Sequence, residues 1–160
     1  MAGGHLQDEI KKRRPFESLH EEALLSLVRT NDQFGIRFSR LFREYGLTPS
    51  QYNVLRILRG EGHPLPSLEI ADRLIAAVPG ITGLIDRLEG LGLVTRERST
   101  EDRRVVFVAI TPKALDLLAR LDEPVKALHR RLLGHLTAAE LADLIRLLEK
   151  ARRPLAEEAE

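Results

Sequence analysis

Two short runs of β-forming residues interrupt a chain whose other apolar residues recur at helical spacing. The runs are GLVTRERS, residues 92–99, and RRVVFVAIT, residues 103–111, and a short polar stretch joins them. Val, Ile and Thr favour strands, so two such runs with a polar connection predict an antiparallel hairpin. We therefore expect a mainly α fold that contains one small β-hairpin.

Helical spacing dominates the N-terminal part of the chain. Apolar residues recur at steps of three and four over residues 17–45, which predicts a long amphipathic helix that ends at Gly46. Thr48 and Gln51 form a capping box, the pattern in which each side chain bonds the other's backbone N–H. A short buried helix is expected from this box to Gly60.

A pair of short helices is expected before the hairpin. Ser67 is a candidate N-cap for LEIADRLIA, residues 68–76, and Pro79-Gly80 separates this helix from a fourth one that ends near Gly90. Two short, closely joined helices followed by a hairpin are typical of a winged helix-turn-helix.

Leucine-rich helices are expected again after the hairpin. Thr111 restarts a helix whose apolar stripe passes Pro124, where we expect a bend or a break because proline lacks an N–H donor. Thr137 and Glu140 form a second capping box ahead of the last helix. These stripes are wider than one small winged domain covers, which favours a homodimer over helices that pack back on their own chain.

Composition excludes several classes of function. The 160 residues include no Cys, which removes thiol catalysis, disulfides and thiolate metal sites, and the five His show no metal-ligand spacing. No phosphate-binding glycine loop, nucleophile elbow or Ser-His-Asp spacing is present, so we expect neither an enzyme nor a cofactor. The sequence has no membrane span or signal peptide, and we expect a cytoplasmic protein. A formal net charge of +1 means that any binding of nucleic acid depends on local placement of charge.

The run LIDRLEGLGLVTRERSTEDRRVVFVAITPKALDLL, residues 84–118, resembles the MarR family of transcriptional regulators. The family's Asp-x-Arg ahead of a strand and an Ile-Thr appears here as Asp102-Arg103-Arg104, followed by Ile110-Thr111. The resemblance covers residues 20–150. It implies a homodimer that binds double-stranded DNA at a pseudo-palindromic operator, most often as a repressor. It also implies release by a small anionic or aromatic effector, whose contact residues the sequence leaves unknown.

The expected architecture is a winged helix-turn-helix domain with long dimerisation helices at both ends. In chain order we expect an N-terminal basic arm (1–16), an N-terminal dimerisation helix (17–46), a winged helix-turn-helix DNA-binding region (47–110), C-terminal dimerisation helices (111–152) and a polar tail (153–160).

The fourth helix is the candidate recognition helix. Its apolar positions share one face and turn the small or polar positions outward, as a helix in a major groove requires. Ser67, at the start of the third helix, is also a DNA-binding candidate. The candidates on the fourth helix and just before it are Pro79, Gly80, Thr82, Gly83 and Arg87. Thr82 is the best single candidate for a base contact, and the scarcity of hydrogen-bonding side chains favours shape readout. Asp86 and Glu89 are possible local partners of Arg87, and for Arg73 we favour pairing with Glu69 or Asp72.

The hairpin loop supplies the remaining candidates, Arg98, Arg103 and Arg104, with Arg96 nearby. A narrow minor groove attracts a guanidinium, and we expect one arginine to enter it while Asp102 pairs with another and shapes the wing. The sequence leaves open which arginine does so, although Arg104 matches the family's motif position. Plain solvated charge is the alternative for this loop, and a winged module for protein association without DNA binding is the alternative function.

Overall fold

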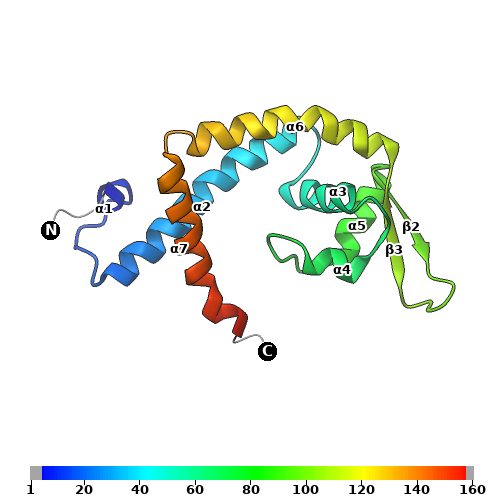
Figure 1. Ribbon diagram of the computed structural model, residues 1–160, viewed down its shortest axis with the longest axis horizontal. Helices are drawn as coiled ribbons and strands as arrows, with labels where there is room; N and C mark the ends of the chain where they lie inside the picture. Colours follow the sequence, from blue (N-terminus) through cyan, green and yellow to red (C-terminus); the bar gives the residue numbers. More distant parts are fainter. Residues whose placement is uncertain (1–4, 158–160) are drawn as a thin grey trace. The chain divides into compact units, whose positions relative to one another are not determined.

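The computed structural model describes residues 5–157. The elements in chain order are α1 (His5–Glu9), α2 (Leu19–Glu44), α3 (Pro49–Glu61), β1 (Leu65–Pro66), α4 (Ser67–Asp72), α5 (Ile81–Gly90), β2 (Val94–Arg98), β3 (Val106–Ile110), α6 (Pro112–Leu133) and α7 (Ala138–Glu157). Mostly helical structure with one small antiparallel sheet confirms the expected fold class (Figure 1). The chain divides after Leu117 into two compact units.

Helices α2, α3 and α5 begin and end close to the expected positions. The predicted capping box at α3 is confirmed: Thr48 Oγ1 accepts from the Gln51 N–H at 3.2 Å, and Gln51 Oε1 accepts from the Thr48 N–H at 2.9 Å. Gly62 ends α3 in the left-handed conformation, at φ 77°, which glycine adopts without the steric cost of a Cβ. The rings of Phe42 and Tyr52 stack with centroids 4.2 Å apart and join the end of α2 to α3.

The expected cap at Ser67 is wrong. Ser67 is the first residue of α4, its N-cap is Pro66, and no side chain caps this helix. Pro66 belongs to the short strand β1, which fixes the backbone at this point and moves the helix start by one residue. The helix also stops at Asp72, so residues 73–76 of the expected third helix lie in the loop before α5.

The hairpin acquires a third strand that the sequence pattern did not indicate. Strand order is β1-β3-β2, and β1 pairs with β3 through Leu65↔Val108 and Pro66↔Phe107. A proline fits this position because β1 is an edge strand and needs no N–H on its open side. Strands β2 and β3 pair in register from Val94↔Ile110 to Arg98↔Val106.

The first unit has a compact aliphatic core formed by α3, α4, α5 and the sheet (Figure 1). Its members are less than 2% exposed: Val54, Leu55, Leu58, Leu65, Ile70, Ile85, Leu88, Val94 and Val108. Burial of each such side chain contributes roughly 1.5–3 kcal/mol to folding. The recognition-helix candidate α5 is therefore held by its apolar face, and its other face stays free.

The second unit contains the rest of α6 and α7. Helix α6 continues through Pro124 without the break that was one of the two expected outcomes, and α7 continues through Pro154. The predicted capping box at α7 is confirmed, because Glu140 accepts from the Thr137 N–H at 2.8 Å and Thr137 Oγ1 accepts from the Glu140 N–H at 3.3 Å.

Both ends of the described chain carry more helix than expected. Residues 5–9 of the expected arm form α1, where Leu6 is 9% exposed, and Glu9 lies 3.7 Å from Arg29 of α2. The expected tail from residue 153 is helical up to Glu157. The parts of these two segments at residues 1–4 and 158–160 lie outside the described residues.

Candidate nucleic-acid interface

Helix α5 presents small and polar residues on its open face. Leu84, Ile85 and Leu88 are at most 4% exposed, whereas Thr82 and Arg87 point to solvent. Pro79 and Gly80, both exposed, lie in the loop ahead of the helix, and Ser67 is partly buried at the start of α4. Pro79, Gly80, Thr82 and Gly83 thus lie at the N-terminal end of α5, with Arg87 further along this helix and Ser67 at the start of α4.

The glycines of α5 leave its surface bare. A Cβ atom placed on Gly80 or Gly83 would meet no atom within 4 Å, so neither glycine is required by packing inside this chain. Gly80 is also the N-cap of α5 and supplies no side-chain cap, which leaves the first N–H groups of the helix open. Such an end attracts anions such as phosphate.

The wing loop is closed by a small network of hydrogen bonds. Ser99 Oγ accepts from the N–H groups of Glu101 at 3.2 Å and Asp102 at 3.3 Å, and the Ser99 N–H donates to the Val105 carbonyl at 3.0 Å. Asp102 Oδ1 accepts from the Arg104 N–H at 3.0 Å. The loop therefore has a defined shape although its residues are polar and mostly exposed.

Asp102 also holds the side chain of Arg104. Its Oδ1 lies 3.3 Å from Arg104 Nε, while the Arg104 side chain remains 92% exposed. The aspartate engages the base of the guanidinium and leaves its outer N–H groups open. Arg103 is exposed too, and no ion pair of the described residues includes it. Asp102 therefore binds Arg104 but not the neighbouring Arg103.

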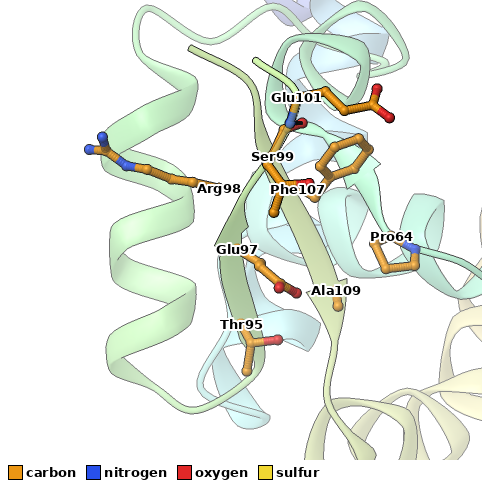
Figure 2. Close-up of a pocket in the computed structure, with 9 residues that line it drawn as sticks. Pro64, Thr95, Glu97, Arg98, Ser99, Glu101, Phe107 and Ala109 are labelled. Atoms are coloured by element: carbon orange, nitrogen blue, oxygen red, sulfur yellow. Dashed lines mark hydrogen bonds between the residues drawn. The ribbon is translucent and has the colours of Figure 1, made fainter. Parts of the chain in front are cut away.

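Arg98 lies at the end of β2 beside a surface hollow of about 500 Å³. Figure 2 shows Arg98 extending away from Glu97 and Phe107, which line the opposite face of the sheet. Alternation along β2 places Arg98 on the same face as Arg96. The side chains of Arg96 and Arg98 thus point away from the face that carries Thr95 and Glu97, and Arg98 lies at the edge of the hollow.

Arg96 and Arg73 each form ion pairs with two acids. Arg96 of β2 binds Asp86 Oδ1 at 2.5 Å and Glu89 Oε2 at 2.8 Å, and Glu89 contributes most to raising the pKa of Arg96. The suggested pairing of these acids with Arg87 is therefore wrong. Arg73 pairs with Glu69, as favoured from the sequence, and also with Glu61 at 2.5 Å. The Arg73 hydrogen bond holds the pKa of Glu61 below its ordinary value.

Sequence reasoning missed several residues that shape this region. Lys113 Nζ donates to the Leu91 carbonyl at 2.7 Å, and Thr111 Oγ1 donates to the Gly92 carbonyl at 2.8 Å. Ser99, which closes the wing loop, was missed as well. A serine two or three positions ahead of an Asp in a tight loop is a known turn pattern, whereas nothing in the sequence links Lys113 to Leu91.

The structure adds no sign of a metal site or membrane segment. No group of three or more His, Asp or Glu side chains in residues 5–157 is placed to hold a metal ion. Within the same described range, none of the helices combines the length and apolarity needed to cross a bilayer.

Known proteins resemble this chain in both sequence and fold. The model of the MarR family matches residues 47–106. The transcriptional repressor IacR of Pseudomonas putida is 33% identical over 123 residues, which cover 77% of this chain and 73% of that protein. The crystal structure of a MarR transcription factor from Planctomyces limnophilus is 50% identical, with a TM-score of 0.66, and the match covers 84% of this chain and 98% of that one. The chain belongs to the MarR family.

This membership confirms the expected class of function. The MarR-family protein is a DNA-binding transcriptional regulator, and its family consists of regulators rather than enzymes. A further relative, the homoprotocatechuate degradative operon repressor of Escherichia coli, is 25% identical over 132 residues that cover 82% of this chain and 88% of that protein. A winged module that binds only protein is not favoured.

Proposed function

We propose that this MarR-family protein is a homodimeric repressor that binds a pseudo-palindromic operator and releases it when a small anionic or aromatic molecule binds. The observations that carry the proposal are the ordered wing loop, in which Asp102 binds Arg104, and the recognition helix, whose glycines leave its surface open. Because its target is DNA, we place its action in the cytoplasm.

In the wing, Arg104 is the arginine that enters the minor groove. Its Nε is held by Asp102 while the rest of the 92% exposed side chain is open, so little conformational entropy remains to be lost on binding. Arg103 and Arg98 then lie beside the groove and contact phosphates, which position the protein without reading sequence.

In the major groove, α5 approaches through its N-terminal end. The small residues Pro79, Gly80 and Gly83 allow close approach of the backbone, and the open N–H groups favour a phosphate. Thr82 contacts a base edge or a thymine methyl, while Ser67 and Arg87 contact the backbone. With so few donors on α5, shape readout carries a large share of specificity.

The exposed apolar residues of the long helices support the homodimer. They lie on α2 and α7: Leu24, Leu27, Val28, Ile145 and Leu147. An unpaired apolar surface of this kind marks an interface. A two-fold dimer presents two recognition helices to two half-sites, which explains the palindromic operator.

The repressor and effector parts of the proposal are supported by relatives. IacR and the Escherichia coli relative are named as repressors, and the latter acts on an operon for degrading an aromatic acid. A ligand of that chemistry lowers DNA affinity only by preferring a dimer geometry that fits the operator poorly.

A footprint on the DNA upstream of the protein's own gene tests these points together. We expect a two-fold symmetric protected site, affinity that falls steeply with salt, and loss of protection with some members of a panel of aromatic and anionic compounds. An unprotected or asymmetric site contradicts the operator proposal. Protection that persists across the whole panel contradicts the effector proposal.

A further inference from the structure

Arg96 joins the wing to the recognition helix through two carboxylates. Asp86 and Glu89 lie three residues apart on one face of α5, and Arg96 reaches both from the middle of β2. Its Nη1 binds Asp86 Oδ1 at 2.5 Å, and Glu89 Oε2 accepts from Nη2 at 2.8 Å and from Nε at 3.0 Å. One guanidinium therefore uses three of its nitrogen atoms on two acids.

These acids are unfavourable on a helix that approaches DNA. Carboxylates near phosphates repel them, and the repulsion grows where water is excluded. Within α5 only Arg87 carries positive charge, so the helix by itself has more acid than base. With Arg96 bound, each carboxylate has an opposite charge beside it, and the surface of the helix is neutral.

The same contacts restrict the wing. Arg96 lies opposite the fully buried Val108 in the sheet register, and its neighbour Val94 is 1% exposed, so the base of β2 is fixed in the core. The guanidinium ties the more exposed part of this strand to the outer surface of α5. The Arg96 ion pairs thus add a connection between α5 and the wing outside the buried core.

We propose that Arg96 is a positioning residue for DNA binding, which neutralises Asp86 and Glu89 and fixes the wing against α5 without itself contacting DNA. The role rests on the proposed use of α5 and the wing, and it goes beyond that proposal because it assigns a function to three residues that touch no DNA. It differs from the roles of Arg98, Arg103 and Arg104, which face the duplex.

A double-mutant cycle separates this role from a direct phosphate contact. The two changes are Arg96→Gln and the paired neutralisation Asp86→Asn with Glu89→Gln, each made alone and then together. If Arg96 is a counter-ion, removal of the acids raises DNA affinity more in the Arg96→Gln background, where the acids are unpaired. If Arg96 contacts phosphate, acid removal frees it and the larger gain appears in the parent background.

We expect Arg96→Gln alone to weaken operator binding about tenfold or more, and the triple variant to recover most of this loss. A gain from acid removal that is equal in both backgrounds, or larger in the parent, overturns the proposal. Arg56→Gln is the matched control, because it makes the same charge change at an exposed position of α3, where Arg56 donates to Asn53 Oδ1 at 2.9 Å. It is expected to change affinity much less.

Trypsin cleavage gives a second readout that needs no DNA. The wing loop offers Arg98, Arg103 and Arg104 as cleavage sites. We expect faster cleavage there in Arg96→Gln and in the triple variant. Both lose the ion pairs of Arg96, even though the triple variant has no unpaired acid. Unchanged cleavage overturns the fixing role. If Arg96→Gln does not fold, Arg96→Met, which also removes the charge, replaces it in the cycle. If the parent protein binds no operator, the proposed function fails first, whereas failure of this proposal alone leaves parent binding intact.

Discussion

Lys113, in the first turn of α6, donates a hydrogen bond of 2.7 Å to the carbonyl of Leu91, the C-cap residue of α5. Thr111 Oγ1 adds a bond of 2.8 Å to the next carbonyl, that of Gly92, and accepts the N–H of Ala114 at 3.3 Å. The end of the recognition helix is thus bound directly to the beginning of the helix that leads into the second unit.

Lys113→Met is expected to lower the free energy of unfolding by about 0.5–1 kcal/mol, because a cation at a helix C-terminus and its hydrogen bond are lost. Operator affinity is expected to fall as well, since α5 loses an anchor. Thermal unfolding and a fluorescence anisotropy titration measure the two effects. Lys126→Met is the matched control, because Lys126 pairs with the exposed Glu123 of the same helix, and equal effects at both sites would contradict the anchoring role.

Asp102→Ala is expected to weaken DNA binding by about tenfold although it makes the chain more positive. The variant loses the bonds to the Arg104 N–H and Nε, so the loop no longer holds its arginine in place. Glu101→Ala makes the same charge change at the preceding residue and is expected to leave DNA affinity unchanged or slightly raised. Stronger binding by Asp102→Ala would mean that the acid acts only by repulsion.

Arg104→Ala is expected to cost more operator affinity than Arg103→Ala. The groove contact of Arg104 depends on the fork shape of its guanidinium, so Arg104→Lys restores little of the loss. Loss of Arg103 is expected to reduce the slope of log affinity against log salt concentration by about one, as for one lost phosphate contact. It should have little effect on sequence preference. Titrations on operator and random DNA at several salt concentrations measure both effects, and the reverse order of losses would assign the groove to Arg103.

Thr82→Ala is expected to weaken operator binding several-fold with no loss of stability. Thr82 is exposed near the start of α5, and alanine is the better helix former by up to about 0.7 kcal/mol, so the fold does not depend on the hydroxyl. Thr30→Ala, at an exposed position of α2, is the control for a threonine unrelated to α5. Thr82→Val and Thr82→Ser then separate the hydroxyl from the methyl contact, and unchanged affinity in all three would remove Thr82 from the interface.

Acid is expected to destabilise α7 through its capping box. The backbone hydrogen bond from Thr137 is the largest cause of the lowered pKa of Glu140. A lowered folded pKa means that the cap stabilises the protein above the ordinary carboxyl pKa, and that this contribution is lost as pH falls from roughly 5 through the lowered value. Chemical denaturation at a series of pH values should show a smaller acid-induced loss in Glu140→Gln, and identical curves would contradict the linkage.

The features that the sequence predicted correctly depend on contacts between near neighbours. The capping boxes at Thr48 and Thr137 need only residues three positions apart, and the hairpin follows from β-forming runs around a polar loop. The pairing of Arg73 with Glu69 is similarly local. Each depends on geometry that a short segment adopts by itself.

Only the tertiary structure decided the contacts between distant segments. Leu65–Pro66 is a strand because β3 offers it a partner, and this strand displaced the expected cap at Ser67. Asp86 and Glu89 bind Arg96 rather than their neighbour Arg87, since the fold of the sheet brings β2 against α5. The sequence by itself determined the order of the elements from α2 to α7 apart from β1, together with the wing and the family. Which charges meet was decided by the packing of the core, because ion pairs form between whichever groups that packing brings together.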